Sequence, residues 1–233
     1  MSNLIACKSN ALTDASYKLS LQEQRFLLVC ISRIDSRVGA PPPDAQKTMT
    51  ITAAEFHEAF PDMGRQNAEA KLKEAIDRLW ERSVIIRTEG KREEFRWVQY
   101  RAQYLTGEAK VEITFSDAIM PYLTQLQGQF TKVVVKNISS LSSVYSIRIY
   151  ELLQRFRGTG DRTISIDDFR SMLDLEDKYS DFKILNRALI KPSIAELNEK
   201  TNLIVDVETV KKGRKVTALR FRFKEDNQIR MAV

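Results

Sequence analysis

The 233-residue sequence predicts an α+β protein made of two tandem domains of one fold. Its length exceeds the usual size of a single domain, so two domains are expected. Apolar residues make up 43% of the chain, which is enough for two cores, and charged residues make up 29%. The same order of helices and strands is expected twice along the chain. A repeat this long indicates duplicated domains rather than a solenoid.

The first copy of the pattern begins with a helix at Ser20. Glu23, three residues later, completes a capping box, and apolar residues follow at helical spacing. Gly39 and the proline run at 41–43 then predict a loop. The elements expected after it are a strand at 49–51, a short helix at 53–60 capped by Thr52, a turn at 61–64, a longer helix at 65–82, a strand at 83–87, a hairpin tip at 90–92 and a return strand at 95–104.

The second copy begins near Leu141 and repeats this order. The elements expected are a helix opened by Ser142 or Ser143 and ending at 157, a strand at 162–166, a short helix at 167–173, a turn at 174–181, a longer helix at 182–200, a strand at 202–207, a hairpin tip at 211–214 and a return strand at 216–223. The strand-to-helix junctions also match, with residues 50–56 resembling residues 165–169.

Helix, strand, helix, turn, helix and hairpin, in this order, make a winged helix. Its two middle helices form a helix-turn-helix whose second helix can lie in the major groove of DNA, and its hairpin is the wing. Between the two copies, residues 115–137 contain a break at Pro121, Gly128 and a strand-like segment at 130–135. We therefore expect the boundary near residue 130, with domains at 1–130 and 131–233.

Composition favours an anionic partner and a cytoplasmic protein. The net charge is +6 and the pI is about 9.3, a balance that weakly favours nucleic acid or another acidic surface. Cys7 and Cys30 form no CxxC pair, so neither a zinc site nor a disulfide framework is expected. No signal peptide and no membrane-spanning segment are expected either.

The long helix of the second copy carries a row of cations. Lys183, Arg187 and Lys191 follow one another at intervals of four residues, which aligns them along one side of a helix. The apolar residues of this helix occupy a different arc: Phe182, Leu185, Leu189 and Leu197. Arg187 is the best candidate for a base contact, because arginine can bind guanine through two hydrogen bonds. Asn186 could read adenine but falls nearer the apolar arc. Pro192 should kink the helix.

Four more cations crowd the tip of the second wing: Lys211, Lys212, Arg214 and Lys215. The helix row alone could be an ordinary solvated basic face. Like charges this close repel one another unless an anion offsets them, and a DNA phosphate backbone would do so. Helix and wing together therefore favour DNA contact by the second domain.

The first domain has a more mixed pattern. Its long helix carries polar and basic residues at Arg65, Gln66, Asn67, Lys71 and Lys73, together with acidic residues at Glu69, Glu74 and Asp77. In its wing, Lys91 and Arg92 are followed at once by Glu93 and Glu94. Phosphate contacts with some base reading, or a role in dimerisation, are both compatible with this pattern.

Residues that carry chemistry are sparse. His57 is the one histidine, and neither a His/Cys cluster nor a phosphate-binding glycine loop is present. The adjacent carboxylates Asp167 and Asp168 are explained by a helix N-terminus. We therefore expect no catalytic residue, no metal and no cofactor, so that any ATP-driven unwinding must come from partners.

Three segments carry a resemblance to a known family, the initiator Rep proteins of iteron-containing bacterial plasmids (the RepA, RepE and Pi type). The first is Lys8–Ser20 followed by Gln24 and Arg25. The second is Tyr179–Thr201, and the third is Lys212–Val216 leading into residues 221–223. The resemblance covers nearly the whole chain in order.

The resemblance implies two winged helices that bind repeated origin sequences (iterons) as a monomer, and a dimer that represses its own gene at an inverted repeat. It implies a dimerisation role for the first domain, and as partners the host initiator ATPase, the replicative helicase and chaperones that promote the monomer. Arg187 matches a family position that reads the major groove. Leu185, Asn186 and Ala188 stand where relatives often carry arginines, which leaves the recognised bases open.

Two alternatives remain at this point. A winged-helix transcriptional repressor with no role in replication would carry the same binding features. An origin-nicking enzyme would need an exposed nucleophile with metal ligands, and no such pattern is found in the sequence.

Overall fold

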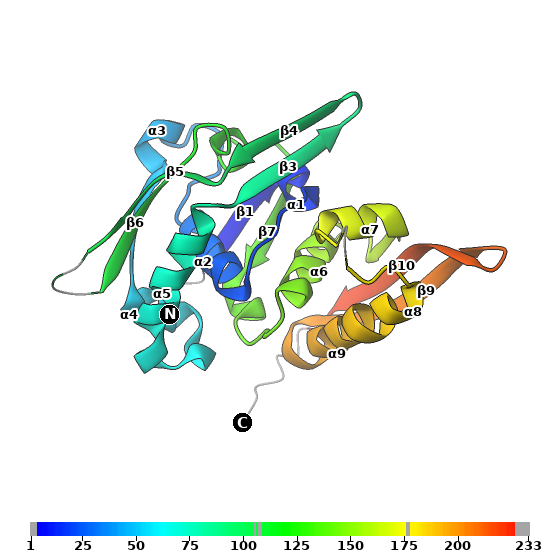
Figure 1. Cartoon of the computed structure of the whole chain (residues 1–233). Helices are drawn as coiled ribbons and strands as arrows, with labels where there is room; N and C mark the ends of the chain where they lie inside the picture. The colour runs from blue at the N-terminus through cyan, green and yellow to red at the C-terminus, as the bar shows by residue number, and fades with distance from the viewer. Residues whose placement is uncertain (1–3, 105, 107–108, 176–177, 227–233) are drawn as a thin grey trace. The chain divides into compact units, whose positions relative to one another are not determined.

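The computed structural model describes residues 4–104, 106, 109–175 and 178–226. The chain divides into two units, Met1–Ser139 and Ser140–Val233, which run from blue to green and from green to red in Figure 1. The division falls after Ser139 rather than near residue 130, because strand β7 (Phe130–Val134) pairs antiparallel with β1 (Ile5–Ser9) inside the first unit. The strand expected at 130–135 is confirmed, and its pairing assigns it to the first domain.

The first domain contains all the elements of the expected winged helix and several more. The expected elements are α2 (Leu21–Ile31), β2 (Thr48–Thr52), α4 (Ala53–Ala59), α5 (Arg65–Leu79), β3 (Ser83–Thr88) and β4 (Lys91–Arg96). The additional elements are β1, α1 (Asn10–Asp14), α3 (Pro43–Gln46), β5 (Val98–Gln103), β6 (Lys110–Phe115) and β7. The predicted capping box is confirmed, since the side chains of Ser20 and Glu23 each accept from the other's backbone N–H.

The helix-turn-helix of the first domain consists of α4 and α5. Thr52 caps α4 in a second capping box, with Glu55 as its partner. After a 3-10 turn at Pro61–Met63, Gly64 has a φ of 73°. This left-handed conformation costs glycine little, so the chain can reverse direction and enter α5. Apolar side chains bury one face of each helix: Phe56, Phe60, Leu72, Ile76 and Leu79.

The single return strand expected at 95–104 is wrong, because the structure has two strands there. β4 pairs with β3 to form the wing, whereas β5 pairs with β6 in a separate sheet of order β2-β6-β5. Trp97 lies between the two strands and is 1% exposed. Burying this indole in the core turns the chain out of the wing and into the second sheet.

The second domain is a winged helix without added strands. Its elements are α6 (Val144–Gln154), β8 (Asp161–Ser165), α7 (Ile166–Met172), α8 (Phe182–Leu185), α9 (Lys191–Lys200), β9 (Leu203–Lys212) and β10 (Lys215–Glu225). Ser143, one of the two expected caps, opens α6, and Ser165 caps α7. The strands form one antiparallel sheet of order β8-β10-β9, and Phe169 of α7 stacks on Phe221 of β10 in the core. The predicted pair of tandem winged helices is thus confirmed.

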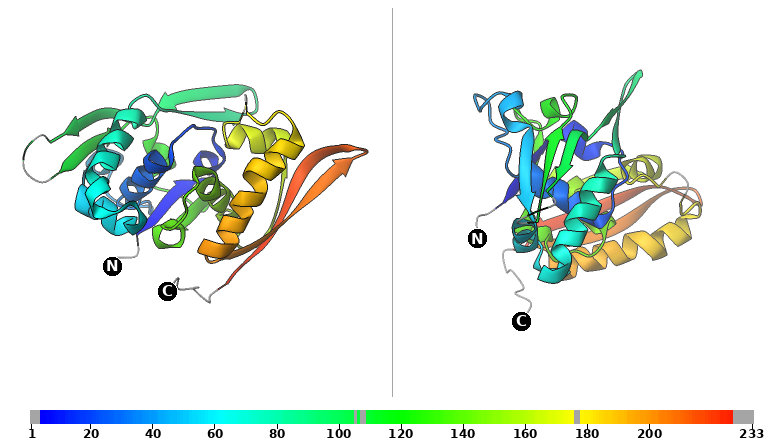
Figure 2. Two further views of the ribbon diagram at one scale, coloured as in Figure 1. Left: turned by 60° about the horizontal axis from the view of Figure 1, so that its bottom comes forward. Right: turned by 60° about the vertical axis from the view of Figure 1, so that its left-hand side comes forward.

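The second wing is longer than the sequence predicts. β9 extends to Lys212, although a strand ending at 207 is expected, and residues 208–215 are all exposed. Figure 2 shows this hairpin, in orange and red, extending away from the body of its domain. Neither face of the distal hairpin packs on a core. The residues of this hairpin are therefore determined by contact with solvent or with a ligand rather than by the packing of the fold.

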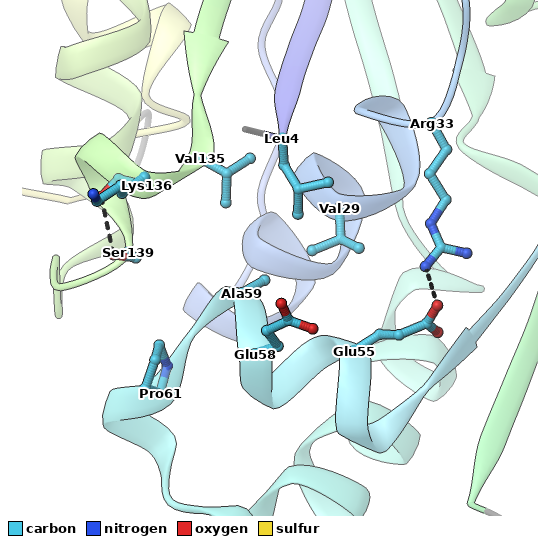
Figure 3. Close-up of a pocket in the computed structure, with 10 residues that line it drawn as sticks. All are labelled: Leu4, Val29, Arg33, Glu55, Glu58, Ala59, Pro61, Val135, Lys136 and Ser139. Atoms are coloured by element: carbon cyan, nitrogen blue, oxygen red, sulfur yellow. Dashed lines mark hydrogen bonds and ion pairs between the residues drawn. The ribbon is translucent and has the colours of Figure 1, made fainter. Parts of the chain in front are cut away.

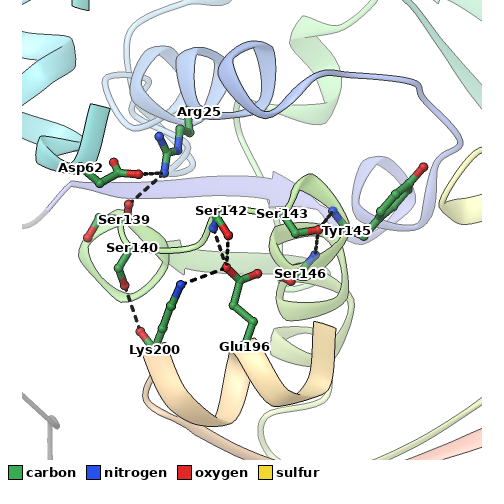
Figure 4. Close-up of polar contacts among 10 residues, drawn as sticks. All are labelled: Arg25, Asp62, Ser139, Ser140, Ser142, Ser143, Tyr145, Ser146, Glu196 and Lys200. Carbon is green, nitrogen blue, oxygen red and sulfur yellow. Dashed lines mark hydrogen bonds and ion pairs between the residues drawn. The ribbon is translucent and has the colours of Figure 1, made fainter. Parts of the chain in front are cut away.

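Each domain fixes its helix-turn-helix with a buried arginine at the same place. Arg25 and Arg148 both stand five residues after the serine that caps the first helix of their domain. Arg25 donates to the Asp62 carboxylate (2.7 Å) and to the Ser139 carbonyl (3.2 Å), as Figure 4 shows. Arg148 donates to the Met172 carbonyl at the end of α7 (3.3 Å) and pairs with Glu151 (2.6 Å). Both arginines therefore anchor the turn that follows the short helix.

Candidate nucleic-acid interface

The recognition helix of the second domain, residues 182–200, contains a π-helical turn. α8 leads into a π turn at Asn186–Ile190, which leads into α9, and the Lys191 N–H donates to the Asn186 carbonyl five residues earlier. Pro192 explains this turn. It has no N–H to donate, and its ring would collide with the carbonyl of Ala188 in a regular α-helix. The wider turn accommodates the proline without ending the helix.

The π turn improves the alignment of the three cations on this helix. An interval of four residues is slightly more than one turn of an α-helix and slightly less than one turn of a π-helix. The deviation from a straight row between Lys183 and Arg187 is therefore offset by the opposite deviation between Arg187 and Lys191. Lys183, Arg187 and Lys191 are all exposed, whereas Asn186 is half-buried. The sequence expectation that Asn186 lies nearer the apolar arc is therefore confirmed.

Within the part of the chain that the structure describes, the side chains of these three cations make no ion pair or hydrogen bond. Lys183 donates only through its backbone N–H, to the Asp181 side chain that caps α8. Among the described residues, no carboxylate thus compensates the charge of the row. Such a row is available to an external anion such as a phosphate.

The second wing concentrates cations at its tip. Gly213 (φ 62°) and Arg214 form the two-residue turn between β9 and β10. Lys212 and Lys215 lie directly opposite each other in the ladder, with Lys211 opposite Val216. Like charges at directly opposite positions destabilise a hairpin. Since the described residues place no carboxylate against the four cations, an external anion would relieve this repulsion.

A polar lock on α9 positions the recognition helix. The Glu196 carboxylate accepts hydrogen bonds from the Ser142 backbone (2.7 Å) and hydroxyl (2.6 Å), as Figure 4 shows. Burial alone would raise the pKa of Glu196, but hydrogen bonds from Ser142 and Ser146 and the nearby charge of Lys200 lower it overall. Glu196 therefore stays ionised at neutral pH and ties α9 to the segment that opens α6.

The recognition helix of the first domain presents a different surface. Arg65, Gln66 and Asn67 are exposed at the start of α5, and Asn67 donates to the Met63 carbonyl (3.3 Å). Further along, Lys71 is half-buried and Lys73 pairs with Glu69 at 2.7 Å. Among the described residues of α5, the exposed polar side chains that make no ion pair thus lie at its N-terminal end.

The cations of the first wing are paired with neighbouring carboxylates. Lys91 contacts Glu93 at 2.7 Å and Arg92 contacts Glu94 at 2.8 Å. The hydrogen bond to Glu93, and then its charge, raise the pKa of Lys91. A phosphate would have to compete with these carboxylates for both cations.

Ile184 is a surface residue of the second recognition helix that the sequence analysis did not single out. It follows Lys183 and is 46% exposed. The signal was present in the sequence, because Ile184 falls outside the apolar arc of Phe182, Leu185 and Leu189.

The first domain also contains a pocket of about 410 Å³ lined by apolar and charged side chains. Figure 3 shows the residues that line it: Leu4, Val29, Arg33, Glu55, Glu58, Ala59, Pro61, Val135, Lys136 and Ser139. Two of them, Arg33 and Glu55, form an ion pair at 2.7 Å. Among the described residues, no three His, Cys, Asp or Glu side chains are grouped to hold a metal ion. No described helix has the length and hydropathy needed to cross a bilayer.

The fold and the basic helix-and-wing surface define a protein of the tandem winged-helix class. Comparison with known proteins agrees. Residues 5–154 match the family model described as "Initiator Replication protein, WH1", and residues 165–223 match "Initiator Rep protein, WH2". The chain therefore belongs to the family of replication initiator Rep proteins. The first family model includes α6, which contacts assign to the second unit.

Individual relatives point the same way. A replication initiation protein of Escherichia coli is 32% identical over 98% of this chain and 72% of its own length. The PI protein of Escherichia coli is 30% identical over 56% of this chain and 47% of its own length. A solved structure of the Pi initiator protein in complex with iteron DNA covers 98% of this chain and 100% of its own, with 22% identity and a TM-score of 0.82. This last likeness shows a shared fold.

Proposed function

We propose that the chain initiates plasmid replication by binding the iterons of its origin, chiefly through the second domain. The observation that carries this proposal is the set of exposed cations on one helix and one wing that no described carboxylate pairs with: Lys183, Arg187, Lys191, Lys211, Lys212, Arg214 and Lys215. Membership of the initiator family and the iteron DNA held by the Pi relative support the choice of DNA sequence.

The residues divide into two roles. Arg187 enters the major groove and reads a base edge, because it lies in the N-terminal half of the recognition helix and its fork-shaped guanidinium suits guanine. Asn186 contributes less, since it is half-buried. The other six cations hold phosphates and set the register of the helix on the duplex.

The first domain serves dimerisation and secondary DNA contacts. Its candidates for DNA contact are Arg65, Gln66, Asn67, Lys71, Lys73, Lys91 and Arg92. In keeping with the family, the monomer binds iterons and the dimer binds an inverted repeat at its own gene. Host partners, namely the initiator ATPase, the replicative helicase and chaperones, supply unwinding and monomer formation. The protein itself works in the bacterial cytoplasm without catalysing a reaction.

Binding is tested with purified protein and a labelled duplex carrying the tandem repeats beside its gene. We expect tighter binding than to a scrambled duplex of the same composition, with the affinity falling steeply as salt increases. Equal affinity for the two duplexes at every salt concentration would overturn the proposal of sequence-specific binding.

A transcriptional repressor would pass the same binding test, so initiation needs its own experiment. A plasmid that depends on these repeats should be lost when the gene is deleted and should be maintained when the protein is supplied in trans. Persistence without the gene would leave a repressor as the better assignment. The nicking alternative predicts Mg²⁺-dependent relaxation of supercoiled origin DNA, whereas the proposed function predicts none.

A further inference from the structure

We infer that Ile184 reads the C5-methyl group of a thymine in the repeat, and thereby adds an apolar contact to the specificity that Arg187 supplies. This inference rests on the proposed function. It deepens it by naming a second residue of the recognition helix that selects a base, and the base it selects.

The position of Ile184 carries the argument. It is the third residue of the recognition helix, whose N-terminal residues are those that meet base edges when such a helix enters the major groove. It is 46% exposed, while its neighbour Leu185 is fully buried. Lys183 precedes it and Arg187 follows one turn later, and both are exposed. The isoleucine thus lies beside two exposed cations of the recognition helix.

The chemistry of that position selects thymine. In the major groove each base pair offers hydrogen-bond donors and acceptors, and thymine alone adds an apolar methyl group. The branched side chain of isoleucine has no polar atom. Its contact with that methyl group therefore replaces contact of both apolar groups with water, which is favourable. Ala188, the next exposed apolar residue, ends at its Cβ atom and leaves room for the longer side chain to reach the groove.

The test replaces thymine by deoxyuridine, which lacks only the methyl group, at each thymine of one repeat in turn. For the unmodified protein we expect one or two positions at which the substitution weakens binding about fourfold, the loss expected for one apolar group returned to water. For Ile184→Ala we expect weaker binding to the natural repeat and no difference between thymine and deoxyuridine at those positions.

Two matched variants make the test specific. Ile204 on β9 is a similarly exposed isoleucine, at 39%, and lies outside the recognition helix. Ile204→Ala should keep the thymine preference. Arg187→Ala should bind more weakly but also keep it, because the arginine does not contact the methyl group. Circular dichroism checks that each variant is folded, which we expect for changes at exposed positions.

The outcomes separate the inference from the proposed function. If the unmodified protein binds the repeat specifically but is insensitive to every deoxyuridine, or if Ile184→Ala keeps the same preference, the inference is overturned and the DNA-binding function stands. If the unmodified protein does not distinguish the repeat from scrambled DNA, the proposed function fails and the inference fails with it.

Discussion

The two domains share one order of elements, but their surface cations have different neighbours. In the first domain, Lys91 pairs with Glu93 and Arg92 pairs with Glu94. In the second domain, the cations of the helix and wing make no ion pair within the described residues. Both domains have a small excess of basic over acidic residues. Net charge therefore does not distinguish the two wings, whereas the pairing of their cations does.

The wings differ in construction as well as in charge. The second wing is the direct extension of a three-stranded sheet, because β8 pairs with β10 and β10 with β9. In the first domain β2 pairs with β6 instead, so the β3–β4 hairpin lies outside the sheet that holds β2. The second wing is the longer of the two and is anchored in the three-stranded sheet.

The largest expected effect concerns the buried arginines that anchor the two turns. Arg148→Met should lower the free energy of unfolding by about 3–5 kcal/mol, because it breaks a buried ion pair of the Glu151 carboxylate, which has no exposed surface. Arg25→Met should cost less, about 1.5–3 kcal/mol, because the side chain of its partner Asp62 is 43% exposed and stays solvated. Urea denaturation followed by circular dichroism measures both.

The chain provides an internal reporter for this experiment. Both tryptophans, Trp80 and Trp97, belong to the first domain, so indole fluorescence follows that domain and far-ultraviolet circular dichroism follows both. The double variant Arg148→Met/Glu151→Met should recover much of the lost stability, because it removes the uncompensated charge. An equal loss for Arg25→Met and Arg148→Met would show that the exposure of the carboxylate does not govern the cost.

The second prediction compares the two recognition helices. Arg187→Ala should weaken binding to the repeat by about 1–3 kcal/mol and relax the preference at one base pair. Arg65→Ala, at the start of α5, should weaken binding less and nearly equally for all sequences. Fluorescence anisotropy with a set of single-base variants of the repeat gives both numbers. If Arg65→Ala relaxed base preference and Arg187→Ala did not, the proposed roles of the two helices would be reversed.

Much of this fold could be predicted from the sequence, because local signals mark its elements. Ser20 with Glu23 and Thr52 with Glu55 form capping boxes that are visible as residue pairs. The split of the expected strand at 95–104 could not be predicted. Trp97 reads as one more apolar residue in an alternating run, and only its burial at the junction of β4 and β5 turns the chain. The pairing of β1 with β7 joins segments far apart in sequence, which local patterns do not reveal.

The positions of the charged residues in the candidate site could be predicted from the sequence, but the groups that they contact could not. The residues Lys183, Arg187 and Lys191 can be read from their spacing, and Pro192 announces an irregular helix. That the irregularity is a π turn, and that it straightens the row, depends on the backbone hydrogen bond from Lys191 to Asn186. Ile184 falls outside the apolar arc of this helix, so its surface position could have been read from the sequence, and the structure leaves it 46% exposed.

The third prediction compares the two wings. Lys212→Ala should reduce the slope of log K against log salt by about 0.9, the value for one phosphate contact. Lys91→Ala should change the slope less, because its ammonium group is paired with Glu93 at 2.7 Å before DNA arrives. Binding isotherms at four or more salt concentrations measure both slopes. An unchanged slope for Lys212→Ala would make the second wing a solvated loop.

The smallest expected effect comes from a double substitution in the first wing. It tests the comparison of the two wings most directly, because it should leave the cations of the first wing unpaired, as those of the second wing are within the described residues. Glu93→Gln/Glu94→Gln removes the partners of Lys91 and Arg92, which are exposed in the wing. At low salt we expect affinity for any duplex to rise a few-fold, and the salt slope to become steeper, because both cations become available to phosphates. Nonspecific DNA measures this gain without interference from base reading.

A matched control separates release of these cations from a general change in net charge. Glu58→Gln/Glu199→Gln removes two exposed carboxylates that belong to α4 and α9 rather than to either wing. Because long-range effects on the duplex are screened over about 10 Å at 0.1 M salt, this control should raise affinity less at that concentration. If both double variants raised affinity equally, net charge rather than pairing would determine how each domain meets DNA. If only the wing variant did so, the carboxylates at 93 and 94 are what keep the first domain from binding DNA as the second does.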